Sequence, residues 1–255
     1  MVTVGILGVG ELTEKILVGL RRSEFSGKIL LSPRNQERAR RLSRVWTCTA
    51  MADNQSVVEG SDLLFLGVRP NAVAELAQEI TLKPDQTLVS LVAGMSLDHL
   101  RQAFPSAFHV RAMLSYAAQI NQSTVVVTPG GEPHESVLSA LGALIVLDRE
   151  EEFELATVAA CMNGWFYFFL NDLQKWFVDN GLSQGQAAQL VLGNMEDCLA
   201  SARSQPLATF EELGSAIATP GTFTAAGLDS LREKGAMTAW TDTCEKVLTL
   251  LSKAT

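Results

Sequence analysis

The spacing of apolar residues changes once along this chain, near residue 148, and that change constrains the fold more than any single motif. Before it, six runs of strand character alternate with amphipathic segments of helical spacing. The predicted strands are 3–8 (TVGILG), 28–32 (KILLS), 62–68 (DLLFLGV), 87–94 (TLVSLVAG), 108–114 (FHVRAML) and 123–128 (STVVVT); the predicted helices are 11–23, 35–45, 71–80 and 135–144. Strands alternating with helices predict a parallel sheet covered on both faces.

After residue 148 every segment has helical spacing, and no run of strand character remains. The first helix is predicted to begin with Asp148 as its cap and to end at Asn180-Gly181. Further helices are predicted over 183–204, 209–217 and 228–253. The fold class is therefore α/β: a domain over residues 1–148 with a parallel sheet, followed by an all-helical domain over residues 149–255.

Composition excludes several classes of function. The chain has 20 basic and 28 acidic residues, a net charge of -8, and shows no basic patch of the kind that binds nucleic acid. The cluster Arg38, Arg40, Arg41 and Arg44 is interpreted as a solvated helix face, with a site for a small anion as the alternative. Four widely spaced cysteines predict neither a disulfide framework nor a metal site.

The N-terminal residues MVTVGILGVG lack a basic region ahead of the apolar run, so we interpret them as a first strand rather than a signal peptide. The longest apolar run, Leu155 to Leu170, is shorter than the roughly 18–20 residues that a membrane-spanning helix needs. We therefore expect a buried or interfacial helix, no membrane partner and a cytoplasmic location.

This helix is apolar nearly all round, with aromatic residues crowded between positions 165 and 177. About one hundred residues of helix bury so much aromatic surface only with difficulty. A homodimer or larger homo-oligomer is the favoured way to cover it, and packing within the same chain is the alternative.

A glycine pattern, Gly8-Val9-Gly10, follows the first predicted strand and opens the first predicted helix. The first glycine permits a tight turn, the second lets backbone amides approach a pyrophosphate, and the helix N-terminus adds partial positive charge. Gly8, Gly10, Glu11 and Leu12 are therefore predicted to contact a dinucleotide, which makes the N-terminal domain Rossmann-type. Two features oppose this: Thr13 replaces the third glycine, and Glu11 adds a negative charge near the phosphates.

The second predicted strand ends without the acidic residue that binds the ribose 2′-hydroxyl of NAD. It is followed by Ser32-Pro33-Arg34-Asn35, and a hydroxyl with a guanidinium suits a 2′-phosphate. Ser32, Arg34 and Asn35 are thus predicted to favour NADP(H). The alternative is that Ser32 and Asn35 merely cap a helix.

The order of the motifs resembles the pyrroline-5-carboxylate reductase family over almost the whole chain. The N-terminal half contributes GILGVGELTEKILVGL, SPRNQERARRL, DLLFLGVRPNAVAELAQEI, LVSLVAGMSLDHL and VRAML; the C-terminal half contributes GLSQGQAAQLVLGNMED and ELGSAIATPGTFTAAGLDSLREKGAMTAW. The second set resembles that family's helical dimerisation domain. The family's hydroxyl-rich substrate loop corresponds to TPGTFT (219–224).

The resemblance implies that NADPH reduces a cyclic imine carboxylate, pyrroline-5-carboxylate or a close analogue, to proline or its counterpart. Thr219, Gly221 and Thr222 would bind the carboxylate, Phe223 would shape the pocket, and Thr224 would act at the ring nitrogen as the catalytic residue. Further cofactor contacts would come from segments that follow strands, namely Val68, Arg69, Pro70, Ala93, Gly94 and Met113. For the loop itself, a capped helix start at Thr219-Pro220 is the alternative.

Departures from the family pattern lie mostly on the substrate side. The residues after Met113 are Leu-Ser-Tyr-Ala, the stretch 159–165 is AACMNGW, and Thr222 stands where the family has a second glycine. A reshaped imine pocket is one interpretation; an NADP(H)-binding regulatory or sensor protein with weakened catalysis is the alternative. His99, His109 and His134 are isolated, so no proton donor is predicted among them.

Overall fold

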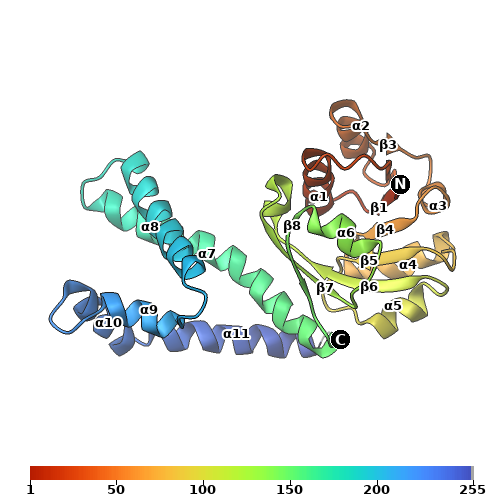
Figure 1. Ribbon diagram of the computed structural model, residues 1–255. Helices are drawn as coiled ribbons and strands as arrows, with labels where there is room; N and C mark the ends of the chain where they lie inside the picture. Colours follow the sequence, from red (N-terminus) through yellow and green to blue (C-terminus); the bar gives the residue numbers. More distant parts are fainter. Residues whose placement is uncertain (254–255) are drawn as a thin grey trace. The chain divides into compact units, whose positions relative to one another are not determined.

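The computed structural model describes residues 1–253 and divides into two compact units (Figure 1). One unit is Met1–Ala160 together with the end of the last helix from Leu248, and the other is Cys161–Val247. Two helices continue across the division: Phe153–Asp179 runs from the first unit into the second, and Ala236–Ser252 runs back into the first. The predicted domain limits, 1–148 and 149–255, stay a prediction.

The first unit contains all eight strands of the described chain. In order it comprises β1 (Val4–Leu7), α1 (Glu11–Arg22), β2 (Ile29–Leu31), α2 (Gln36–Val45), β3 (Thr49–Ala50), α3 (Asn54–Glu59), β4 (Leu63–Leu66), the 3-10 turn η1 (Pro70–Ala72), α4 (Val73–Glu79), β5 (Thr87–Ser90), α5 (Leu97–Ala103), β6 (Phe108–Met113), η2 (Tyr116–Ile120), β7 (Ser123–Thr128), α6 (His134–Ser139) and β8 (Gly142–Val146). The strand order is β3-β2-β1-β4-β5-β6-β7-β8. The first six strands follow the Rossmann order, in which the chain reverses direction across the sheet between β1 and β4. This confirms the predicted fold class.

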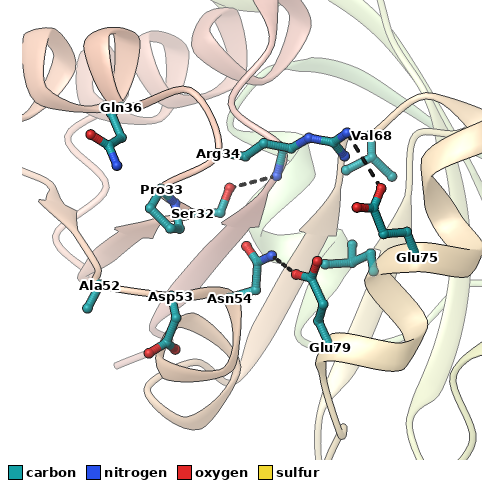
Figure 2. Close-up of a pocket in the computed structure, with 12 residues that line it drawn as sticks. Ser32, Pro33, Arg34, Gln36, Ala52, Asp53, Asn54, Val68, Glu75 and Glu79 are labelled. Carbon is teal, nitrogen blue, oxygen red and sulfur yellow. Dashed lines mark hydrogen bonds and ion pairs between the residues drawn. The ribbon is translucent and has the colours of Figure 1, made fainter.

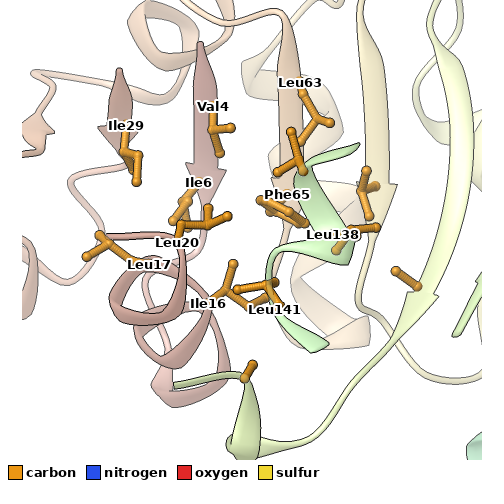
Figure 3. Close-up of a cluster of buried hydrophobic side chains, with 14 of the residues drawn as sticks. Val4, Ile6, Ile16, Leu17, Leu20, Ile29, Leu63, Phe65, Leu138 and Leu141 are labelled. Atoms are coloured by element: carbon orange, nitrogen blue, oxygen red, sulfur yellow. The ribbon is translucent and has the colours of Figure 1, made fainter. Parts of the chain in front are cut away.

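Each face of the sheet is buried by a layer of apolar side chains from the sheet and from the helices that cover it. Alternate strand residues explain the division: Ile6 and Phe65 pack on α1, α2 and α6 (Figure 3), while Leu64 and Leu66 pack on α3, α4 and α5. β1 and β4 are buried along their whole length, as central parallel strands are. The core therefore fixes the C-terminal ends of β1 and β4, where ligands bind in open α/β sheets.

The sheet differs from the sequence prediction in three places. β3 and β8 were not predicted, and the helix expected over 135–144 ends at Ser139. Residues 142–146 instead form β8, which pairs in parallel with β7. The pairing brings Gly142, with φ +150, so close to β7 that a side chain at this position would overlap the Ser123 carbonyl oxygen. The expectation of a parallel sheet is also wrong at one pair, since β7 runs antiparallel to β6. The connection 114–122 is shorter than the roughly dozen residues that a parallel crossover needs.

The C-terminal part of the described chain is helical throughout, as predicted. It comprises the 3-10 turn η3 (Glu150–Glu152), α7 (Phe153–Asp179), α8 (Gln184–Ser204), α9 (Phe210–Ile217), α10 (Phe223–Glu233) and α11 (Ala236–Ser252). Asp148 does not cap α7, because a 3-10 turn beginning after Arg149 precedes that helix. The helix predicted over 228–253 is two helices, which separate at Gly235 with φ +67.

Aromatic side chains of the second unit concentrate on α7, and Trp240 of α11 packs against them. The indole of Trp240 packs among Trp165, Phe166 and Phe169 at ring-centroid distances of 5.6–6.2 Å. Within residues 1–253, Glu150–Asp179 is the one helical stretch whose length and apolar composition suffice to cross a membrane. It is longer than the apolar run 155–170 on which the prediction of no membrane helix was based.

Candidate functional site

The turn between β1 and α1 forms the centre of the candidate site. Gly8 has φ +91, and a Cβ there would lie 2.7 Å from Val68 and 2.8 Å from the Gly67 carbonyl oxygen. Gly10 is the N-cap of α1, and a Cβ on Gly10 would approach no heavy atom nearer than 4.0 Å. Glycine is thus required at position 8 by the backbone and the neighbouring atoms, whereas a side chain at position 10 would meet only one ordinary contact, with the Gly67 carbonyl oxygen. A ligand can reach the backbone at Gly10.

Thr13, at the third position of the motif, stabilises the turn through its side chain. Its Oγ1 accepts from the Gly10 amide at 2.8 Å and donates to the Gly8 carbonyl at 2.9 Å, and its methyl group packs where a side chain on Gly67 would lie. The side chain is buried. Thr13 therefore stabilises the glycine turn, and its presence does not count against a dinucleotide site.

Glu11 lies at the first helical position, but its carboxylate is held by two partners to the side of the turn. Tyr116 donates its hydroxyl to Glu11 at 3.1 Å, and Arg38 on α2 lies 3.9 Å away. Burial, followed by this hydrogen bond, raises the pKa of Tyr116. These contacts offset the charge that Glu11 brings near the helix N-terminus.

Two cavities, of about 420 and 390 Å³, open along the C-terminal ends of the parallel strands. Both are lined by Gly8, Arg34 and Val68 (Figure 2 shows the first). Ser32 lines the first cavity, and Gly10, Asn35 and Arg69 line the second. Residues from three strand ends, predicted separately from the sequence, thus meet at one edge of the sheet.

Arg34 is the one cation that lines both cavities. Its side chain is 60% exposed and lies 3.7 Å from Glu75 of α4, and in Figure 2 the guanidinium and this carboxylate point toward each other. Ser32 is fully buried, and its Oγ accepts from the Gly8 amide at 2.9 Å. Asn35 caps α2 by accepting from the Arg38 amide at 3.2 Å. Ser32 and Asn35 therefore support the turn and the helix, in agreement with the structural alternative for Asn35.

The remaining predicted cofactor residues lie outside the lining of these two cavities. Leu12 packs on the core below the turn, and Pro70 is the first residue of η1. Ala93 and Gly94 form a turn after β5, with Gly94 at φ +68. Met113 is the half-buried last residue of β6. All five stay predictions.

Several lining residues were not predicted from the sequence. Ala52, Asp53 and Asn54 follow β3, a two-residue strand without a recognisable pattern. Glu75 and Glu79 lie four residues apart on α4 and face the first cavity. Their spacing places both acids on one face of the predicted helix, but nothing in the sequence shows that this face points toward the cavity.

The predicted substrate loop forms a capped helix start in the second unit. Thr222 is the N-cap of α10: its Oγ1 accepts from the Ala225 amide at 3.1 Å and donates to the Thr219 carbonyl at 2.8 Å, which the Thr222 amide also contacts. Gly221 has φ +85 and Thr222 has φ -89, so only the glycine needs its special backbone freedom. The alternative cap at Thr219 is wrong by three residues.

This loop is open to solvent in the single chain. Phe223 is 99% exposed, Thr224 is exposed, and they are the first two residues of α10. The first amides of an α-helix have no acceptor within the helix, and Thr222 satisfies only that of Ala225. The amides of Phe223 and Thr224 therefore remain able to bind an anion.

Comparison with known proteins assigns both halves of the chain. Residues 3–94 match the family model described as NADP oxidoreductase coenzyme F420-dependent, and residues 150–251 match that of pyrroline-5-carboxylate reductase dimerisation. Two matched halves and relatives that cover most of the chain together support membership of the pyrroline-5-carboxylate reductase family. Its relatives include the pyrroline-5-carboxylate reductases of Mycobacterium leprae, 28% identical with 92% of this chain and 90% of the relative covered, and of Corynebacterium melassecola, 22% identical with 92% of each covered.

Solved structures of this family have the same fold. The pyrroline-5-carboxylate reductase of Streptococcus pyogenes superposes with a TM-score of 0.85 at 23% identity, covering 99% of this chain and 98% of the other. The Plasmodium falciparum enzyme, crystallised with NADP bound, superposes with a TM-score of 0.86 at 18% identity and the same coverage. A reductive aminase of Aspergillus terreus in complex with NADPH is a more distant neighbour, with a TM-score of 0.60 and 16% identity over 100% of this chain and 93% of the other.

Proposed function

We propose that this chain is an NADPH-dependent reductase of a cyclic imine carboxylate, pyrroline-5-carboxylate or a close analogue. The observation that carries the proposal is the pairing of two features in one chain. A glycine turn opens toward a cavity at Gly10 in the first unit, and a helix with free N-terminal amides follows Thr222 in the second. The relatives and solved structures named above support the same reaction and the same cofactor.

The residues at the turn fit a dinucleotide. Gly10 lines the second cavity, which supports a pyrophosphate site there, and the amides of Glu11 and Leu12, at the first two positions of α1, have no acceptor within that helix. Arg34 follows β2 and lines the cavity, which supports its assignment to the 2′-phosphate. By family resemblance, Val68, Arg69, Pro70, Ala93 and Gly94 would border the cofactor, and Met113 would contact the nicotinamide.

Bound NADPH would supply the hydride, so the protein has to hold the imine, orient it and exclude water. We assign the substrate carboxylate to the amides of Phe223 and Thr224, where the α10 dipole adds favourable charge. Thr219, Gly221 and Thr222 shape the turn that presents them, and the Thr224 hydroxyl bonds the ring nitrogen. A ring nitrogen that is already protonated in solution needs no separate proton donor in the protein.

A homodimer or larger homo-oligomer is the proposed working form. Aromatic side chains of α7 are exposed in the single chain, with Phe168 at 75% and Tyr167 at 68%. A second copy that covers this surface accounts for the apolar length of α7 without a membrane. A cytoplasmic location follows from the same assignment.

A second candidate is an NADP(H)-binding regulatory or sensor protein with weakened catalysis. Thr222, Phe223 and the stretch 159–165 depart from the family pattern on the substrate side, whereas the glycine turn is intact. This candidate predicts nucleotide binding without turnover.

The test is an NADPH-oxidation assay against cyclic imines with five- and six-membered rings, each with and without a carboxylate. Turnover of the five-membered imine carboxylate, and much less of the imine without the carboxylate, is the expected result. Tight NADPH binding with no turnover of any imine would favour the sensor. Failure to bind either NADPH or NADH would exclude both candidates.

A further inference from the structure

The cavity of about 420 Å³ carries more negative charge than a site for a 2′-phosphate requires. Its lining includes one guanidinium, that of Arg34, and three carboxylates, those of Asp53, Glu75 and Glu79 (Figure 2). A 2′-phosphate entering this cavity brings further negative charge. The acids that face it therefore bear directly on the choice between NADPH and NADH.

The three carboxylates have different partners. Asp53 caps α3 by accepting from the Ser56 amide at 2.7 Å, a bond that lowers the pKa of Asp53. Glu79 accepts from the side-chain amide of Asn54 at 2.6 Å. Glu75 instead lies against Arg34 at 3.7 Å, with both side chains well exposed. Glu75 is thus the acid that shares a partner with the expected phosphate.

We propose that Glu75 is a specificity-determining residue that lowers the affinity for NADPH and leaves that for NADH nearly unchanged. The proposal rests on the proposed function. The 2′-phosphate of NADPH has to take Arg34 from Glu75 and then lie near the released carboxylate. NADH has no phosphate at this position, so it binds with the Arg34–Glu75 pair intact. Glu75 therefore opposes the selectivity that Arg34 provides.

The effect is moderate because both side chains are exposed to water. An exposed ion pair changes an equilibrium by up to about fivefold, and repulsion of the phosphate by the carboxylate adds to this. We expect Glu75→Gln to tighten NADPH binding about three- to tenfold and to change NADH binding less than about twofold. The difference between wild type and variant should shrink as salt is raised, because screening acts on exposed charges.

The experiment measures dissociation constants for NADPH and NADH by calorimetric titration of the full-length wild type, Glu75→Gln and Glu79→Gln. Glu79→Gln is the matched control: it removes the same charge from the same helix and cavity, but its carboxylate is bonded to Asn54. Glu79→Gln should increase the affinity for NADPH less than Glu75→Gln does. A third arm compares Arg34→Ala with Arg34→Ala/Glu75→Gln. The increase in NADPH affinity caused by Glu75→Gln should be smaller in this background than in the wild type.

Arg34→Ala alone should weaken the binding of NADPH about tenfold and change the binding of NADH by less than about twofold. Unchanged or weaker NADPH binding by Glu75→Gln would overturn the proposal, and so would equal tightening by the two Gln variants. Wild-type protein that binds neither nucleotide would instead overturn the proposed function, which keeps the two failures distinct.

Discussion

The two units of this chain bury their apolar side chains to very different extents. In the first unit, large side chains such as Phe65, Phe104 and Phe153 are completely or almost completely buried. In the described chain after Ala160, Ala187 and Val191 are the only residues that are buried. The first unit thus completes its core with its own residues, whereas the second presents an apolar surface that a single copy does not cover.

This difference indicates that the apolar residues of the first unit pack against the same chain, whereas those of the second unit pack against another copy. The central strands of the first unit, β1, β4 and β5, are buried along their whole length by helices of the same chain. In the second unit, α7 has apolar residues over most of its circumference, which is typical of a helix covered from more than one side. Substitutions should therefore affect stability in the first unit and assembly in the second.

The largest effect should follow a charge placed on the exposed aromatic surface. Phe168→Glu replaces a 75% exposed ring on α7, and in a twofold-symmetric dimer each substitution acts twice. Burial of one such ring is worth about 1.5–3 kcal/mol, so the dimer should weaken at least about 100-fold and the activity should fall with it. Light scattering coupled to gel filtration measures the change.

Ile120→Glu is the control for this substitution, because Ile120 is 56% exposed but lies on η2 in the first unit. It should leave the mass in solution unchanged. Equal masses for wild type and Phe168→Glu at micromolar concentration would contradict the assignment of this surface to a second copy.

A second substitution tests the first unit where the chain leaves the sheet. Arg111 at the end of β6 is 3% exposed; it lies 2.6 Å from Glu154 and 3.4 Å from Glu150, and its guanidinium covers the Phe153 ring at 4.1 Å. Arg111→Met leaves two acids near the sheet without their cation. Loss of one partner from a buried pair costs about 3–5 kcal/mol, which should appear as a lower free energy of unfolding in urea.

The matched control is Arg149→Met, which breaks the exposed pair with Glu152 at 2.7 Å. Such a pair is worth less than about 1 kcal/mol. Equal losses of unfolding free energy for the two variants would show that burial does not strengthen the Arg111 cluster.

The comparison of the units also explains what could be predicted from the sequence. The strands buried on both faces gave a clear apolar signal, and the glycine turn followed from one of them. β3 was not predicted because it is only two residues long. β8 was not predicted because its start depends on the close approach of Gly142 to Ser123, a contact that local sequence does not show.

The same limit applies to the candidate site. Gly8 and Arg34 were predicted because each follows a strand, Val68 was predicted from the family resemblance, and the three residues meet in the cavities. Glu75 and Asp53 were missed because nothing local marks which helix faces point toward the sheet edge. In the second unit the loop itself was recognisable, but the position of its cap, at Thr222 and not Thr219, depends on the left-handed backbone of Gly221.

A third prediction separates the structural from the functional hydroxyls of that loop. Thr224→Ala should lower kcat for imine reduction by about 10- to 100-fold with no change in NADPH affinity, because its hydroxyl has no capping role and is assigned to the ring nitrogen. Thr222→Ala removes the α10 cap and should destabilise the second unit by about 1 kcal/mol. Thr224→Ser should recover most of the activity. Full activity in Thr224→Ala would move the substrate site elsewhere.

The smallest expected effect is the pH dependence of the stability of the first unit, in which two histidines are buried. His134 contacts the Pro129 carbonyl at 3.0 Å through Nε2 and has a buried Nδ1 without a hydrogen-bond partner, and His109 contacts the Phe104 carbonyl at 2.7 Å. Burial lowers the pKa of both imidazoles in the folded state, although Glu135 and Glu132 near His134 act in the opposite direction.

A lowered folded-state pKa means that the unfolded chain takes up these protons first as the pH falls. The stability from the neutral rings should therefore be complete above the unfolded pKa of about 6.5 and should decline below it, toward the folded-state pKa. Urea midpoints measured between about pH 7.5 and pH 5.5 should fall in the wild type and fall less in His109→Gln/His134→Gln. His99→Gln, at an exposed position, should keep the wild-type slope; a double variant with that same slope would show that carboxylates alone set the pH dependence of the first unit.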